Sequence, residues 1–168
     1  MRHGAIVGVA VAACGALPAM AAAPARLRFT GIGPLKVGMT LAHARATGWI
    51  AHPTNGCELA APRPVVYRLD GRRAPAGLSG EVQFDSGRLS LVVVSAGART
   101  ALGTQAGTPW RTMVRRYSAA GFTVTAKFDT TFQQRFVDVS RRGHLMLQAT
   151  TKGRLVADLA VPNLAFCE

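Results

Sequence analysis

Hydrophobic residues recur along this chain with two spacings, one typical of helices and one typical of strands. The first helical segment runs from Leu41 to Thr47, where Leu41 and Ala44 lie three positions apart and share one face. Thr40 is placed to cap its N-terminus, and Gly48 provides a C-terminal stop. We therefore expect a short helix between these two residues.

The second helical segment has a longer apolar stripe, with residues at positions i, i+3, i+4 and i+7. Its members are Trp110, Met113, Val114 and Tyr117. Thr108 is the expected N-cap, Pro109 suits the first helical position, and Gly121 ends the segment. A stripe of this kind indicates a helix that packs on a sheet rather than a ligand-binding face.

After each helix the spacing changes to the alternation of β-strands. The expected strands are 65–69, 81–84 and 89–94 after the first helix, and 122–128, 132–139, 145–150 and 154–161 after the second. Turns at 141–144 and 151–153 separate the last three strands, which favours an antiparallel meander. Residues 71–79 are expected to form an exposed loop.

Two landmarks recur in the same order along the chain. Residues 35–40 and 104–109 each open a helical segment, and Gly-Arg-Leu at 87–89 and at 153–155 each begins a β-rich run. This recurrence predicts a duplicated unit. The predicted fold class is therefore α+β, with tandem repeats at 26–98 and 99–168, each a short helix packed on an antiparallel β-meander. The two sheets could join into one concave surface.

Residues 1–22 have the layout of a secretory signal peptide. Arg2 and His3 precede an apolar stretch at 5–13, and small residues follow at 19–21. The alternative is a lipid anchor on Cys14, whose surroundings resemble a lipobox, although the leader before it is short for a lipoprotein. The apolar run is mostly Ala and Gly, so we expect no membrane span. We predict a secreted bacterial protein, either extracellular or associated with the cell wall.

Removal of this leader leaves two cysteines, Cys57 and Cys167. Two cysteines in an exported protein are typically paired. Their bond would close a loop of about 110 residues and stabilise the fold by on the order of 4–5 kcal/mol. Neither cysteine has a His or another Cys at metal-ligand spacing, so we assign both a structural role.

The chain of 168 residues is strongly basic, with 20 Lys and Arg against 8 Asp and Glu and a formal charge of +12. Loss of the leader removes Arg2 and lowers this charge to about +11. Three arginine pairs lie in a loop, on a helix and at a turn: Arg72, Arg73, Arg115, Arg116, Arg141 and Arg142. Such a charge attracts anions at low ionic strength. Outside the cell this favours an anionic cell-wall polymer or an acidic protein over any specific nucleic acid. The alternative is that the charge reflects only composition and solubility.

Catalytic and metal-binding patterns are absent from the sequence. His43, His52 and His144 include no pair at the i, i+4 spacing of a helical metal site, and Ser79 and Ser118 stand in no nucleophile motif. We therefore predict no catalytic residues, no metal and no cofactor, and expect a monomeric binding protein rather than an enzyme. A small hydrolase would need carboxylates and a His gathered in one cleft.

The sequences Gly38-Met39-Thr40 and Gly107-Thr108, each at the start of a helix followed by a meander, carry a resemblance. The chain resembles the β-lactamase inhibitor protein family and, one repeat at a time, is similar to the small lipoprotein of the outer-membrane barrel assembly machinery. The resemblance implies two helix-plus-sheet modules whose joined sheet is a concave protein-binding surface. Those inhibitors have a disulfide within each repeat, whereas this chain has one cysteine in each half. We therefore expect a binding protein, with inhibition of a secreted enzyme such as a β-lactamase as the alternative.

Overall fold

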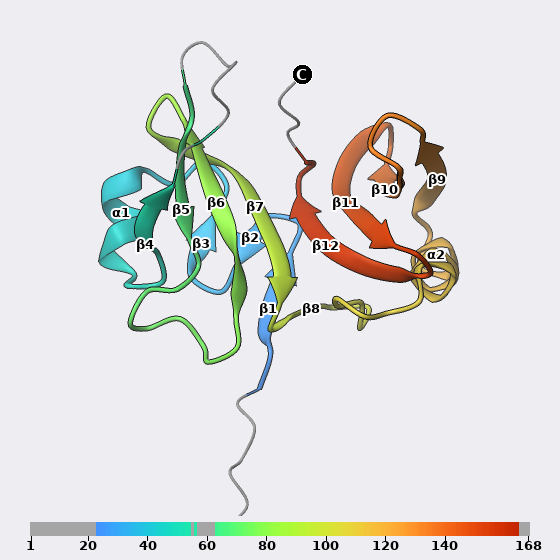
Figure 1. Ribbon diagram of the computed structural model, residues 1–168, viewed down its shortest axis with the longest axis horizontal. Helices are drawn as coiled ribbons and strands as arrows, with labels where there is room; N and C mark the ends of the chain where they lie inside the picture. The colour runs from blue at the N-terminus through green and yellow to red at the C-terminus, as the bar shows by residue number, and fades with distance from the viewer. Residues whose placement is uncertain (1–22, 55, 57–62, 165–168) are drawn as a thin grey trace, which may run out of the picture.

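The computed structural model describes residues 23–54, 56 and 63–164, which form two sheets and two helices (Figure 1). The small sheet has the order β3-β2-β1-β8. Its strands are β1 (Ala25–Arg28), β2 (Gly31–Ile32), β3 (Leu35–Lys36) and β8 (Ala98–Thr100). β1 and β8 pair in parallel, so residues from both ends of the first half of the chain meet in one sheet.

The large sheet is antiparallel and has the order β4-β5-β6-β7-β12-β11-β10-β9. Its strands are β4 (Ala51–Thr54), β5 (Val65–Arg68), β6 (Ser79–Asp85), β7 (Arg88–Ala96), β9 (Thr123–Asp129), β10 (Gln134–Arg141), β11 (His144–Lys152) and β12 (Leu155–Val161). The two halves of the chain join where Val93 of β7 pairs with Ala160 of β12. The meander expected in the second half is confirmed by the pairing of β9 to β12 in chain order.

Two short helices precede these meanders, α1 (Leu41–Ala46) and α2 (Trp110–Ala119). The cap predicted for the first is confirmed, because the Thr40 hydroxyl accepts a hydrogen bond from the backbone N–H of His43. The cap predicted for the second is wrong. Pro109 occupies the N-cap position, and the Thr108 hydroxyl accepts instead from the backbone N–H of Gln105 at 3.0 Å.

The predicted fold class, an α+β protein of two helix-on-meander repeats, is wrong. Strand makes up 50% of the described residues and helix only 12%, so the fold is mostly β, with sheets of four and eight strands. The prediction gave weight to the helix caps and overlooked the whole small sheet as well as β4. Strands of two residues are too short to show any alternation of hydrophobic and polar positions.

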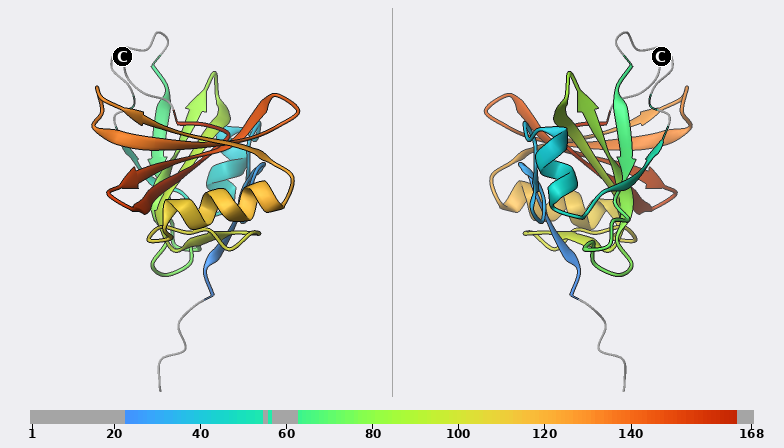
Figure 2. Two further views of the ribbon diagram at one scale, coloured as in Figure 1. Left: turned by 90° about the vertical axis from the view of Figure 1, so that its right-hand side faces the viewer. Right: turned by 90° about the vertical axis from the view of Figure 1, so that its left-hand side faces the viewer.

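One hydrophobic core lies between the large sheet and the layer formed by the helices and the small sheet. Alternate residues of the large sheet turn towards it, and those fully buried include Val82, Val92, Val137, Val139, Leu147 and Leu159. Leu27 of β1 and Met113 of α2 belong to the same cluster. Figure 2 shows the large sheet as a twisted layer with α2 beside its second half and α1 beside its first.

Candidate binding surface around Trp110

The three predicted arginine pairs lie at three separate places in this fold. The pair at 72–73 follows β5, and the backbone N–H of Arg73 donates to the carbonyl of Gly48 just after α1. The pair at 115–116 is exposed on α2, and the pair at 141–142 is exposed at the turn between β10 and β11. Figure 1 shows α1 and α2 on opposite sides of the molecule. The pairs therefore do not share one basic face.

A different group of basic side chains surrounds Trp110, the first residue of α2. The guanidinium carbon of Arg135 lies 4.7 Å from the centroid of the Trp110 ring, and that of Arg111 lies 5.3 Å from it. Both are within the range of cation–π attraction. Arg154 lines the same hollow, which has a volume of about 410 Å³.

Backbone hydrogen bonds fix the start of α2 against the large sheet. The Trp110 N–H donates to the carbonyl of Arg154 at 3.1 Å, and the Val156 N–H donates to the carbonyl of Thr108 at 2.8 Å. The Gly107 N–H in turn donates a hydrogen bond to the carbonyl of Val156. Because this segment is joined to the beginning of β12, the indole is held beside the turn between β11 and β12.

Arg135 reaches the indole because of its register in β10. It pairs directly with Phe128 of β9 and lies on the same side of the strand as Val137 and Val139, which are fully buried. An arginine at the end of an inward-facing row covers apolar surface with its alkyl stem and keeps its charged group near water. The guanidinium carbon of Arg135 also lies 5.8 Å from the centroid of the Phe128 ring.

One large apolar side chain beside this group is open to solvent, since Phe128 is 48% exposed. We call the combined surface the Trp110 patch, which consists of Trp110, Arg111, Phe128, Arg135 and Arg154. Trp and Arg are among the residues that contribute most to the binding energy of protein interfaces.

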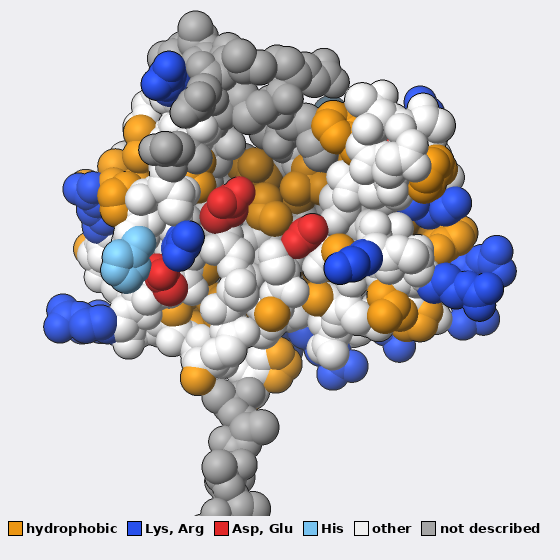
Figure 3. All heavy atoms as spheres, in the orientation of Figure 1, with side chains coloured by type: hydrophobic (Ala, Val, Ile, Leu, Met, Phe, Trp, Pro, Cys, Tyr) orange, Lys and Arg blue, Asp and Glu red, His pale blue; other side chains and the backbone are white. Residues whose placement is uncertain are grey.

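The charge of the Trp110 patch is not balanced locally. Across the described ranges, the only ion pair joins His52 to Asp70, whose Nδ1 and Oδ2 atoms are 3.0 Å apart. No Asp or Glu is among the described residues that line the hollow at Trp110. Figure 3 shows Asp and Glu side chains near the middle of one face and most Lys and Arg side chains towards its margins. The patch therefore presents a local excess of positive charge.

The arginine pairs predicted from the sequence do not include Arg135 or Arg154, so the Trp110 patch was missed. The overlooked signal is the position of Arg135 in line with Val137 and Val139, where the alternation calls for an apolar residue. Its contact with Trp110 depends on how α2 packs, which no local pattern encodes. The stripe of α2 does pack on the core as expected, since Met113 and Tyr117 are buried.

Several carboxylates gather in a separate hollow of about 540 Å³, lined among others by Asp70, Glu81 and Asp158. Both oxygens of Asp158 accept hydrogen bonds, from the Ser95 hydroxyl at 2.7 Å and the Thr150 hydroxyl at 2.8 Å. These bonds tie β7, β11 and β12 together. The Asp158 carboxylate thus has a structural task in joining the two halves of the sheet.

The three histidines that the structure describes lie on separate elements. His43 contacts the Thr40 hydroxyl on α1, His52 pairs with Asp70 beside β4, and His144 begins β11. In the part of the chain that the structure describes, no three His, Cys, Asp or Glu side chains are grouped so as to hold a metal ion.

The expected signal peptide at 1–22, the lipidation candidate Cys14 and the expected disulfide between Cys57 and Cys167 lie outside the described residues. They stay predictions from the sequence. Neither described helix has the length and apolar character needed to cross a membrane.

No family model, curated protein or solved structure matches this chain. The resemblance to the β-lactamase inhibitor proteins therefore stays a prediction as well.

Proposed function

We propose that this chain is an exported, non-enzymatic binding protein whose Trp110 patch engages an acidic surface of another protein. The observation that carries the proposal is the grouping of three guanidinium groups, none in an ion pair with a described residue, with exposed Phe128 around one partly exposed indole. Charge steers an acidic partner towards the patch, and burial of the apolar side chains then supplies affinity.

The exposed apolar side chains favour a protein over an anionic cell-wall polymer as the partner. A polymer would use the arginines alone and leave Phe128 in water. A protein surface can cover Phe128 and the indole together with the arginines, and full burial of a Phe side chain contributes about 1.5–3 kcal/mol. The anionic polymer is therefore one outcome of the test, and inhibition of a secreted enzyme is another.

The first test compares acidic peptides of equal length and equal charge, with either Leu or Ser placed between the glutamates. The Trp49→Phe variant leaves Trp110 as the remaining tryptophan, so its fluorescence reports binding. We expect the Leu peptides to bind at least about tenfold more tightly than the Ser peptides, because only they bury the apolar part of the patch. Equal affinities for the Leu and Ser peptides would show that charge accounts for all of the attraction, and they would support an anionic polymer as the partner.

Matched variants locate the binding surface. Phe128→Ser should remove most of the difference between the Leu and Ser peptides, whereas Val65→Ser should leave it intact. Val65 is a suitable control because it is 43% exposed on β5, in the other half of the sheet. Arg135→Gln should weaken both peptides more than Arg72→Gln does. Equal effects of these arginine variants would contradict a role for the patch.

The inhibitor alternative is tested with a panel of class A β-lactamases. We expect no inhibition at micromolar concentrations of the protein. Sub-micromolar inhibition would replace the general binding proposal with the inhibitor alternative, and Arg135→Gln would then show whether the same patch is responsible.

A further inference from the structure

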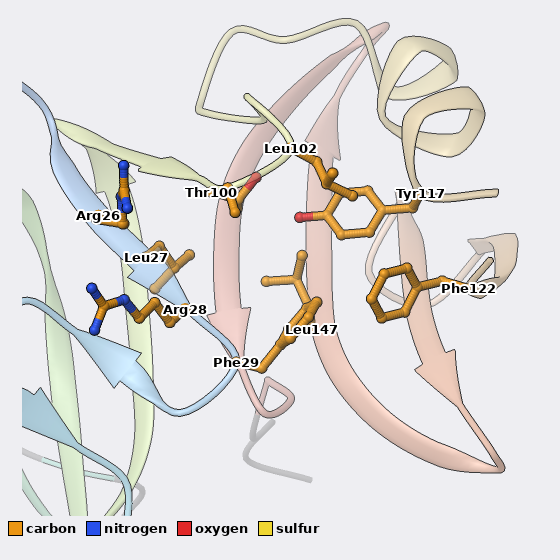
Figure 4. Close-up of a pocket in the computed structure, with 10 residues that line it drawn as sticks. Arg26, Leu27, Arg28, Phe29, Thr100, Leu102, Tyr117, Phe122 and Leu147 are labelled. Carbon is orange, nitrogen blue, oxygen red and sulfur yellow. The ribbon is translucent and has the colours of Figure 1, made fainter. Parts of the chain in front are cut away.

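An apolar cavity of about 400 Å³ lies between the small sheet, α2 and β11 (Figure 4). Leu27, Tyr117 and Leu147 line it, and each is about 1% exposed, so its walls belong to the folded core. Phe29 and Phe122 complete an aromatic wall, with ring centroids 5.3 Å apart. A volume of this size lies at the lower end of the range of small-molecule sites, roughly 300–1,000 Å³.

Arg26 and residues 100–102 line both this cavity and an adjoining polar hollow, so the two spaces are direct neighbours. The hollow is lined by Arg26, Arg99 and Arg116. In Figure 4 the side chains of Phe29, Leu102 and Tyr117 surround the cavity. Arg26 and Arg28 also line it, and both are exposed on β1. The alternation of β1 thus turns Leu27 towards the core and places positive charge at the surface beside the cavity.

Two guanidinium groups converge beside Gly103. A nitrogen of Arg116 lies 3.3 Å, and a nitrogen of Arg99 3.5 Å, from the position that a β-carbon would take at Gly103. Arg116 also donates to the Gly103 carbonyl at 2.8 Å, which fixes its side chain. Like charges held this close repel each other, and an anion between them would stabilise both. No carboxylate is among the described residues that line either space.

We propose that the cavity and this arginine-lined hollow together bind a single-chain anionic amphiphile. The alkyl chain occupies the space among Leu27, Tyr117 and Leu147, and the anionic head group, a carboxylate or a phosphate, lies on Arg99 and Arg116. The volume of the cavity fits one alkyl chain, and the positive charge of the hollow selects an anionic head group. This site is separate from the Trp110 patch, so it does not depend on the function proposed above.

Calorimetric titration of the full mature chain at fixed ionic strength tests the proposal with three probes. Dodecanoate, below its critical micelle concentration, should bind with one site per chain. Acetate, which has the head group without the chain, should give no measurable heat, and dodecyltrimethylammonium should bind at least about tenfold more weakly. Shortening the carboxylate should raise the dissociation constant about fourfold for each methylene removed.

Two matched variants separate the site from the general charge. Arg99→Gln with Arg116→Gln should weaken dodecanoate binding at least tenfold, whereas Arg72→Gln with Arg73→Gln removes the same charge and should change it less than twofold. Leu102→Trp, which fills the space where the cavity meets the hollow, should abolish binding.

Three results would overturn the proposal. The first is equal binding of dodecanoate and the cationic amphiphile, which would show an apolar cavity without selection for an anion. The second is equal weakening by the two double variants, and the third is binding only above the critical micelle concentration. The comparison of ligands uses the unaltered protein and so decides the question even if a variant fails to fold.

Discussion

The phenol of Tyr117 shows how the core acts on a single titratable residue. Burial raises the pKa of Tyr117 above its usual value near 10, and the hydroxyls of Thr100 and Thr104 partly offset the rise. Burial is the larger of these opposing effects. The folded state therefore favours the neutral phenol.

This shift predicts a stability difference at alkaline pH. The contribution of Tyr117 is fully present below the unfolded pKa of about 10 and is lost as the pH rises through the higher folded pKa. Tyr117→Phe cannot ionise, so its free energy of unfolding should fall less steeply above pH 10 than that of the unaltered protein. Urea unfolding of both proteins from pH 8 to pH 11 measures the difference. Parallel curves would show that ionisation of this phenol is not linked to folding.

Arg135 shows what can and cannot be predicted from single residues. Its place in a strand was evident from the alternation around Val137 and Val139, and that strand is confirmed as β10. Its stacking on Trp110 was not evident, because it requires α2 to begin next to β12. A charge at an inward-facing position was the available signal, and its partner depends on tertiary packing.

At the scale of secondary-structure elements, Gly80 allows β6 to pair closely with β7. Its φ of +150° lies in a region that L-residues rarely adopt, and a β-carbon there would be 2.1 Å from the carbonyl oxygen of Val93. The register also shifts between Ser79 and Gly80. An added methyl group would have to push the neighbouring backbone away.

Gly80→Ala should therefore lower the free energy of unfolding by about 2–4 kcal/mol, from backbone strain and the steric clash together. Gly87→Ala is the matched control, because Gly87 has a φ of +76° but open space around it. Gly87→Ala should lower the free energy of unfolding only by the backbone strain, about 1–2 kcal/mol. Chemical unfolding of both variants measures the difference, and equal losses would show that the contact with Val93 relaxes freely.

The elements differ in how far the sequence predicts them. The strands from β9 to β12 have seven to nine residues and enough alternation to be found. β2 and β3 have two residues each, and β8 has three, so they are recognisable only from their pairing. The cap at Thr40 was predictable because it is local. The cap at Thr108 was not, because β12 holds the backbone of that residue.

At the scale of the whole molecule, the formal charge of +12 is spread over separate places rather than gathered on one face. The pair at 72–73 lies near α1, the pair at 115–116 lies on α2, and the pair at 141–142 lies at a hairpin turn beside Phe122, which follows α2. Exposed charges are screened over roughly 8 Å at physiological ionic strength. A flexible polyanion should therefore meet each of these pairs as a separate weak contact.

This distribution predicts how the protein behaves on a heparin resin. Replacement of any one pair by Gln should lower the salt concentration needed for elution by a similar amount, and the three changes should add, because distant sites contribute independently. The elution salt of the three double variants and of their combination measures this. A dominant effect of the pair at 115–116 would contradict a diffuse field and would point to the hollow beside Arg116 as a local anion site. An elution salt unchanged in all variants would mean that the basic excess of this chain plays no part in binding polyanions.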